Sequence, residues 1–338
     1  MLEVSHLNVV LQTHRGPGVA VRDISFSLAR GQTLGLVGES GCGKSITAMA
    51  LLGLLPEGAQ VTGSIRFGGE ELIGRSEREM DRIRGNRIGM ISQEPMTALN
   101  PVHSIGRQVA EPLRLHRGLD AAAARREAIA LLDRVGIPDA RRRVDAYPHQ
   151  FSGGQRQRVT IAMALACGPD LVIADVPTTA LDVTVQQQIL DLIRGLVAER
   201  GMALMLISHD LGVIAQNVQR MMVMYGGSVV ENGPTADVFA RRMHPYTLGL
   251  FGARPGLHSR KGQRLTTIPG TVPELVDLPA GCPFAGRCRF TVPACHVTVP
   301  PPHAVAAGHD ARCIRLDAVA QDKAAAGQGG AARAAAHG

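Results

Sequence analysis

The chain has 338 residues, which is enough for one large domain with an appendage or for two modest domains. Aromatic residues make up 3% of it and tryptophan is absent, which argues against nucleic-acid binding by base stacking. The net charge of +7 favours acidic partners such as a nucleotide or an anionic lipid, although the arginine-rich runs are interpreted as solvated helix faces. Since no apolar run approaches the roughly 20 residues that span a bilayer, we expect a soluble chain.

The order of predicted elements indicates an α/β fold. Strands and turns are predicted for residues 1–37, and a helix should follow from Ser45 to Leu55, because Pro56 ends it. Helical spacing predominates in residues 105–165. The apolar runs "DLVIAD" and "ALMLISHD" then indicate two strands separated by a helix. Strand–helix–strand order with polar residues at the strand ends is typical of an open parallel sheet.

The stretch "GESGCGKS", residues 38–45, matches the phosphate-loop pattern in full and lies between a predicted strand and a predicted helix. Its glycines allow backbone N–H groups to face phosphates, Lys44 can reach the terminal phosphates, and the Ser45 hydroxyl can ligate magnesium. The sequence therefore predicts a site for ATP and Mg²⁺. Residues expected to contact the nucleotide here are Gly38, Ser40, Gly41, Cys42, Gly43, Lys44, Ser45 and Ile46.

A second motif is "FSGGQRQRV", residues 151–159. Alone it is ambiguous, because Ser-Gly-Gly is a common turn as well as a candidate anion site at the head of a helix. Between a phosphate loop and "LVIAD", however, it makes the chain resemble an ABC-type ATPase. The resemblance implies a P-loop NTPase (RecA-like) core over residues 1–235, with a helical subdomain at about 95–165. It also implies that a signature loop caps the γ-phosphate bound by the opposite subunit of a dimer; here that loop is Ser152, Gly153, Gly154 and Gln155.

The same resemblance implies roles for residues outside these loops. Gln93 in "MISQEP" would sense the γ-phosphate, and Asp175 at the end of "LVIAD" would hold Mg²⁺ together with Ser45 and Gln93. Asp182 in "TALD" would belong to the D-loop, and His209 in "LISHD" would be the switch histidine. The implied catalytic set is Lys44, Gln93, Asp175 and His209.

Two positions depart from the family. Val176 stands where ABC ATPases carry the glutamate that polarises the attacking water, so we expect tight ATP binding and slow hydrolysis at this chain's own site. A naturally degenerate site and a substitution that traps the ATP-bound state explain Val176 equally well. In addition, residues 1–25 contain no Phe, Tyr or Trp to stack on adenine, and Gly18 or Val19 fills the usual place. His14 is the alternative stacking residue.

Longer stretches narrow the resemblance. "PMTALNPVHSIGRQ", "YPHQFSGGQRQRV" and "HPYTLGL" resemble ATP-binding subunits of oligopeptide, dipeptide and nickel importers. Such a subunit works at the cytoplasmic face of the inner membrane, peripherally attached to two transmembrane permease subunits. Its other partners are a second ABC ATPase subunit and an extracytoplasmic substrate-binding protein. Nucleic acid is not an expected partner. The alternatives are a regulatory subunit that never hydrolyses ATP, an importer of nickel or another small solute, and a soluble ABC protein acting on DNA or ribosomes.

Residues 236–315 are rich in proline and are expected to form a loop-rich extension, like the one that this importer branch carries. A cluster of four cysteines there favours metal over disulfides, with an iron–sulfur cluster, zinc and unmetallated thiols as the alternatives. The resemblance favours a structural 4Fe–4S cluster. Residues 316–338 are expected to be a disordered Ala- and Gly-rich tail. The four cysteines are Cys282, Cys288, Cys295 and Cys313.

Overall fold

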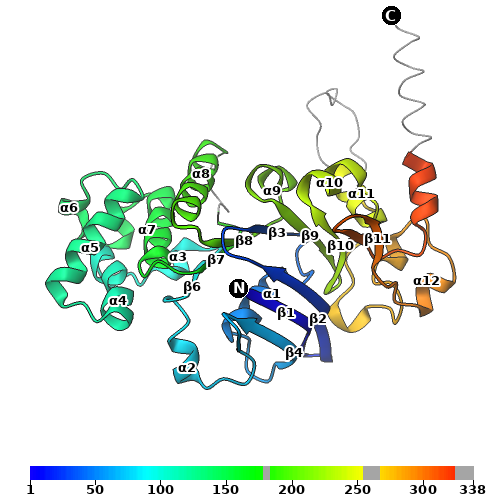
Figure 1. The fold of residues 1–338 in the computed structure, drawn as a ribbon, viewed down its shortest axis with the longest axis horizontal. Helices are drawn as coiled ribbons and strands as arrows, with labels where there is room; N and C mark the ends of the chain where they lie inside the picture. The colour runs from blue at the N-terminus through cyan, green and yellow to red at the C-terminus, as the bar shows by residue number, and fades with distance from the viewer. Residues whose placement is uncertain (178–182, 254–266, 324–338) are drawn as a thin grey trace, which may run out of the picture.

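The computed structural model of the chain describes residues 1–177, 183–253 and 267–323. Along the long axis of the molecule, a lobe of helices lies at one end, two sheets lie in the middle, and the C-terminal extension lies at the other end (Figure 1). In the part of the chain that the structure describes, no helix is both long enough and apolar enough to cross a bilayer.

The smaller sheet is antiparallel and has the strand order β2-β1-β4-β5. It forms because alternate residues of its strands are apolar and turn to one side, where they are buried. Those side chains pack with helix α1 (Lys44–Leu52) and with one face of the larger sheet in a single core cluster. The strands are β1 (Leu2–Thr13), β2 (Gly16–Leu28), β4 (Gln60–Phe67) and β5 (Glu70–Glu71).

The larger sheet has the order β11-β12-β10-β9-β3-β8-β7-β6, and strands β9, β3, β8, β7 and β6 are parallel. The predicted strands of "DLVIAD" and "ALMLISHD" are β7 and β8, and the helix predicted between them is α8 (Val183–Arg200). Because β3, β7 and β8 are neighbours, their carboxyl ends bring three loops to one edge of the sheet. The parallel strands are β3 (Thr33–Val37), β6 (Ile88–Ile91), β7 (Leu171–Asp175), β8 (Ala203–Ser208) and β9 (Arg220–Tyr225).

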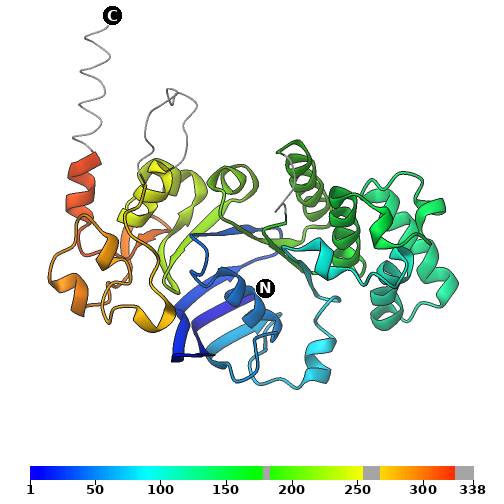
Figure 2. The ribbon, with the colours of Figure 1, turned by 180° about the vertical axis from the view of Figure 1, so that it is seen from behind.

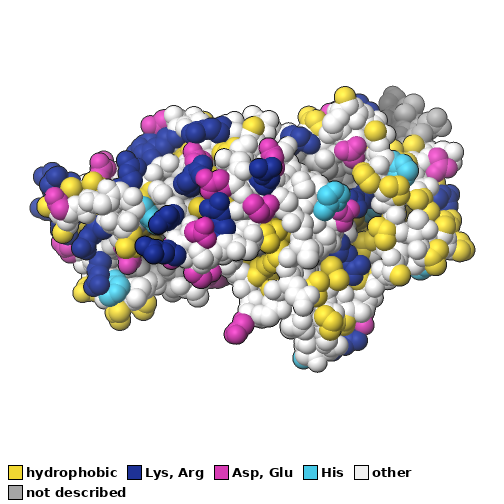
Figure 3. Space-filling model, turned by 60° about the horizontal axis from the view of Figure 1, so that its bottom comes forward, with side chains coloured by type: hydrophobic (Ala, Val, Ile, Leu, Met, Phe, Trp, Pro, Cys, Tyr) yellow, Lys and Arg dark blue, Asp and Glu magenta, His cyan; other side chains and the backbone are white. Residues whose placement is uncertain are grey.

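The helical lobe contains the helices predicted for residues 105–165. Ser104 and Asp120 cap helices α4 and α5 by accepting backbone hydrogen bonds, and a second core cluster joins this lobe to the other face of the larger sheet. Lys and Arg side chains gather on its surface (Figure 3), as expected for solvated helix faces. The elements are α2 (Glu77–Asp81), which precedes the lobe, and α3 (Pro95–Ala98), α4 (Ile105–Arg117), α5 (Ala121–Arg134), α6 (Ala140–Arg143), η1 (Pro148–Gln150) and α7 (Gly153–Leu165).

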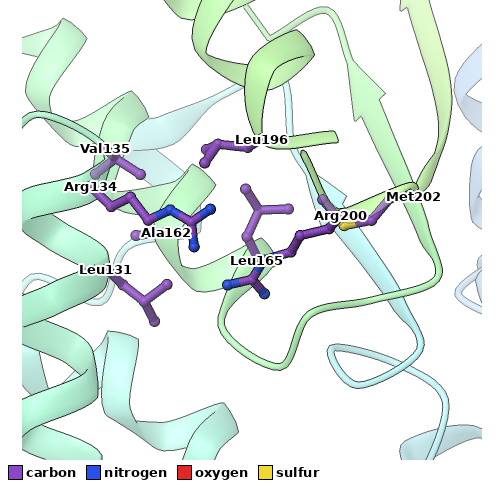
Figure 4. Close-up of a pocket in the computed structure, with 8 residues that line it drawn as sticks. All are labelled: Leu131, Arg134, Val135, Ala162, Leu165, Leu196, Arg200 and Met202. Atoms are coloured by element: carbon purple, nitrogen blue, oxygen red, sulfur yellow. The ribbon is translucent and has the colours of Figure 1, made fainter. Parts of the chain in front are cut away.

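Helices α5, α7 and α8 meet at a small enclosed gap of about 10 Å³ (Figure 4). Its apolar side chains come from all three helices, and Arg134 and Arg200 extend towards it from α5 and α8. The gap is far too small for a ligand, whose pockets occupy roughly 300–1,000 Å³. It is therefore a packing defect between helices.

The C-terminal extension returns to the sheets. Strands β10 and β12 pair with each other, so the extension continues the larger sheet. Residues 316–323 are helical and Val319 is fully buried, so the predicted disordered tail begins, instead, as a packed helix. Residues 324–338 of that tail lie outside the described part. The elements are α9 (Leu211–Asn217), β10 (Ser228–Pro234), α10 (Thr235–Arg241), α11 (Pro245–Gly252), η2 (Leu275–Asp277), η3 (Ala285–Arg287), α12 (Ala294–Val297), β11 (His303–Ala306) and β12 (His309–Ala311).

Candidate functional site

The loop between β3 and α1 has the backbone that close approach to phosphates requires. Gly38 and Gly43 have φ angles of 153° and 100°, in the region that favours glycine. A Cβ atom on Gly38 would lie 2.2 Å from the Met224 carbonyl oxygen, and one on Gly43 would lie 2.5 Å from the Ala20 carbonyl oxygen. Both glycines are thus required by the packing of the loop as well as by its turn.

Lys44 is buried at the start of α1, with its ammonium group inside the loop. Its Nζ donates to the carbonyl oxygens of Gly38 and Glu39, each at 2.9 Å. Helix α1 begins without a side-chain cap, so its first N–H groups point into the loop. These donors and the ammonium group together form a site for a polyanion.

Asp175 lies at the carboxyl end of β7, next to this loop. Its side chain is buried, hydrogen-bonds with Ser45, and leaves Oδ1 without a partner. Burial raises the pKa of this carboxyl, opposed by the Ser45 hydroxyl and by the charge of Lys44. An orphaned carboxylate oxygen beside a hydroxyl fits a Mg²⁺ ion that also binds phosphate oxygens. Asp175 and Ser45 are therefore the residues that would hold the ion.

A cavity of about 560 Å³ opens over the loop and collects the predicted residues from distant parts of the sequence. Gln93 reaches it from the segment after β6, and His209 from the end of β8. Its size suits a nucleotide. The lining residues are Leu11, Ala20, Ser40, Gly41, Gly43, Lys44, Ser45, Ile46, Gln93, Val176, His209 and Leu275.

Val176 lines the same cavity and brings no acid to it. It is nearly buried, packs in the core cluster around α1, and donates its N–H to the Ile207 carbonyl at 2.9 Å. Its φ of 40° is rare for a β-branched residue and stores strain in the backbone directly after β7. At this point the cavity has an apolar wall.

Three contacts with the extension reach the site, and sequence reasoning missed all of them. Leu275 of η2 lines the nucleotide cavity. Arg287 of η3 pairs with Glu39 of the phosphate loop, at 2.7 Å from Nη1 to Oε2 and 3.2 Å from Nη2 to Oε1. The Tyr246 hydroxyl accepts the Glu39 N–H at 2.8 Å. The sequence signal for Arg287 is the stretch "GCPFAGRC", in which the arginine directly precedes the second cysteine.

Comparisons with known proteins agree with this geometry. A family model described as ABC transporter matches residues 21–179, and one described as the C-terminal region of oligopeptide/dipeptide transporters matches residues 230–295. A peptide import ATP-binding protein of Brucella melitensis is 51% identical over 335 residues, covering 95% of this chain and 98% of that protein. The chain belongs to the ATP-binding subunits of oligopeptide/dipeptide ABC transporters.

Two further proteins are similar to most of this ABC subunit. The oligopeptide transport ATP-binding protein OppD of Mycobacterium tuberculosis is 48% identical over 94% of this chain and 52% of that protein. A solved ATP-binding cassette, in a dimeric post-hydrolysis state bound to ADP and Pi, has a TM-score of 0.62 and 26% identity over 70% of this chain and 99% of that one. The family consists of transport ATPases that bind and hydrolyse ATP with Mg²⁺, and the P-loop NTPase fold predicted from the sequence is confirmed.

The signature loop of this ABC subunit lies apart from its own nucleotide cavity. Ser152 caps α7 by accepting the Gln155 N–H at 3.3 Å, and the Gln155 side chain accepts the Ser152 N–H in return. Ser152, Gly153, Gly154 and Gln155 are absent from the residues that line the cavity. Ser152 and Gly153 are exposed, and α7 begins at Gly153, where the first N–H groups of a helix have no backbone partner within the helix. The D-loop residue Asp182 lies outside the described residues.

The four cysteines of the extension line one small cavity of about 10 Å³, together with Phe284. Burial raises the pKa of the Cys282 and Cys313 thiols to about 11. Yet among the described residues no three His, Cys, Asp or Glu side chains are arranged so as to hold a metal ion. The predicted iron–sulfur cluster is therefore not confirmed.

Proposed function

We propose that this chain powers the import of short peptides and that its own nucleotide site binds ATP tightly but hydrolyses it slowly. The observation that carries the proposal is Val176, an apolar residue in the wall of the nucleotide cavity at the position expected for the water-activating acid. A missing general base typically costs about 10²- to 10⁴-fold in rate. Lys44, Asp175 and His209 remain to bind and orient the phosphates, and phosphoryl transfer depends mainly on such positioning.

The exposed signature loop supports a role in a dimer of ATP-binding subunits. The N–H groups of Gly153 and Gly154 at the head of α7 would cap the γ-phosphate of ATP bound to a second ATPase subunit and so complete that subunit's site. The remaining partners would be two permease subunits and an extracytoplasmic substrate-binding protein, with this chain at the cytoplasmic membrane face. Short peptides are proposed because the similar Brucella protein is named for peptide import and the Mycobacterium protein for oligopeptide transport.

ATP turnover by the assembled transporter tests the hydrolysis proposal. We expect Val176→Glu to raise turnover about 10²-fold if this site is limiting, with stimulation by the substrate-binding protein retained. Val176→Gln, which has a similar shape but no basic carboxylate, is the matched control and should leave turnover unchanged. Equal turnover in all three would assign the chemistry to the partner's site, and this chain would then be a regulatory ATP clamp.

For the extension we propose a structural 4Fe–4S cluster. The support is that cysteine thiolates are the ligands of iron–sulfur clusters and that all four cysteines line one cavity, which would have to widen to hold the cluster. Iron and acid-labile sulfide, assayed in the anaerobically purified chain, should each approach four per chain. Cys295→Ser should lose them, whereas Cys167→Ser, a buried cysteine outside the cavity, should not. Zinc, or no metal, would refute the cluster.

A further inference from the structure

One wall of the nucleotide cavity is formed by apolar side chains from two distant parts of the chain. Leu11 of β1 and Ala20 of β2 belong to the N-terminal hairpin, whereas Leu275 belongs to η2 of the extension. Leu11 pairs with Gly18 across the hairpin, and Gly18 and Ala20 lie on one face of β2 because side chains alternate along a strand. Figures 1 and 2 both show the extension beside β2.

Gly18 provides the space that Leu275 occupies. A Cβ atom on Gly18 would lie 2.8 Å from the Leu275 Cβ and 3.6 Å from the Val276 Cγ1, so a larger residue at position 18 would displace the extension. Gly18 is also, with Val19, one of the two residues that fill the place of the aromatic residue expected to stack on adenine. Leu275 of the extension therefore lies at the place where the hairpin has no aromatic side chain.

The segment around Leu275 is anchored on both sides of that residue. Arg15, in the turn between β1 and β2, donates to Glu274 at 2.9 Å and to the two carboxylate oxygens of Asp277 at 2.6 and 2.8 Å. These ion pairs are exposed, so each contributes little free energy. Their effect is geometric. Because Arg15 binds a carboxylate on each side of Leu275 in the sequence, these contacts hold the Leu275 side chain over the hairpin.

We propose that Leu275 contacts the nucleobase of ATP and completes, with Leu11 and Ala20, an apolar platform for its flat face. The phosphate loop supplies N–H groups and a cation for the triphosphate, and these three residues are the apolar part of the same cavity. Aliphatic side chains offer dispersion and desolvation but no hydrogen bonds, so the platform would recognise the presence of a purine and not its identity. The proposal concerns nucleotide binding by this chain and is independent of the transported solute.

The test compares a ligand that has a base with one that does not. We measure the Kd of Mg·ATP, Mg·GTP and Mg·tripolyphosphate for the full-length chain by calorimetry. Leu275→Ala should raise the Kd of ATP and of GTP by a similar factor, about 5- to 20-fold, and leave that of tripolyphosphate unchanged. Gly18→Ala, which pushes the segment away without altering Leu275, should give the same pattern. It also tests the proposal if Leu275→Ala does not fold.

Leu278→Ala is the matched control, because Leu278 lies in the same segment but contacts the Gly226 turn instead of the cavity. It should change none of the three Kd values. If Leu275→Ala weakens tripolyphosphate as much as ATP, or weakens neither, the base contact is wrong. A loss in Leu278→Ala equal to that in Leu275→Ala would also overturn it, because the segment would then act through its general stability.

Discussion

Arg287 of the extension and Glu39 of the phosphate loop form a two-pronged ion pair across 248 residues of sequence. The arginine side chain is 7% exposed and also donates to the Pro269 carbonyl at 2.8 Å, so its fork is held from both sides. The glutamate follows Gly38, whose carbonyl oxygen binds Lys44. The extension therefore fixes the first turn of the loop that would bind the phosphates.

Removing this arginine should loosen the loop. Arg287→Ala leaves a largely shielded carboxylate without its partner, which we expect to lower the free energy of unfolding by about 2 kcal/mol and to weaken ATP binding several-fold. Arg287→Lys keeps the charge but loses the fork and should recover only part of both. Arg289→Ala removes an exposed arginine two residues away and should cost less than about 0.5 kcal/mol. Urea unfolding and ATP titration check these values. Equal effects of Arg287→Ala and Arg289→Ala would contradict the role of the Arg287–Glu39 pair in holding the loop.

The strained backbone at Val176 predicts an unusual response to glycine. Val176→Gly loses buried apolar contacts but relieves a φ of 40°, worth about 1–3 kcal/mol, so the net change in stability should stay within about 1 kcal/mol. Val172→Gly, in the middle of β7, relieves no strain and should cost about 3 kcal/mol or more. Chemical denaturation of both variants checks the comparison, and similar costs would show that Val176 is unstrained.

The buried His244 predicts a loss of stability in mild acid. Burial lowers its pKa to about 4, opposed by the nearby Glu231 carboxylate and by a hydrogen bond to the backbone of Arg312, and its Nδ1 accepts the Tyr246 N–H at 3.1 Å as the cap of α11. Because the folded pKa lies below the unfolded value of 6.5, this contribution is complete above pH 6.5 and is lost as pH falls towards 4. The loss in the free energy of unfolding over this pH range should be of the order of 3 kcal/mol.

Asparagine at this position can cap the helix without titrating. His244→Asn should therefore flatten the dependence of stability on pH between 6.5 and 4, as measured by urea midpoints at several pH values. Parallel curves for the two proteins would assign the acid sensitivity to other groups.

The signature loop allows a separation of stability from turnover. Ser152→Ala should cost about 1 kcal/mol through loss of the α7 cap, leave the ATP Kd of this chain unchanged, and lower turnover of the assembled transporter. Ser104→Ala removes the equivalent cap of α4, where the Ser104 hydroxyl accepts the Arg107 N–H at 3.4 Å. It should cost the same stability without affecting turnover. A fall in turnover with both variants would mean that stability alone is responsible.

The sequence predicted contiguous features well and distant contacts poorly. The phosphate loop, the helix that follows Ser152 and the strand ending at Asp175 depend on neighbouring residues, and all are present. The Glu39–Arg287 pair and the position of Leu275 depend on how the extension folds back, which local patterns do not encode. The helix at residues 316–323 was missed because Ala-rich composition resembles a disordered tail, whereas its stability comes from burying Val319.

The fold-back of the extension has a consequence for synthesis. Glu39 and Lys44 leave the ribosome long before Arg287, and during that interval the loop has every phosphate-binding group but not the arginine that holds it. The nucleotide site thus matures late, when the last third of the chain has been translated and has closed on the first fifty residues. A chain that stops before the extension would keep the complete phosphate-loop motif and still be an unfinished ATP-binding protein.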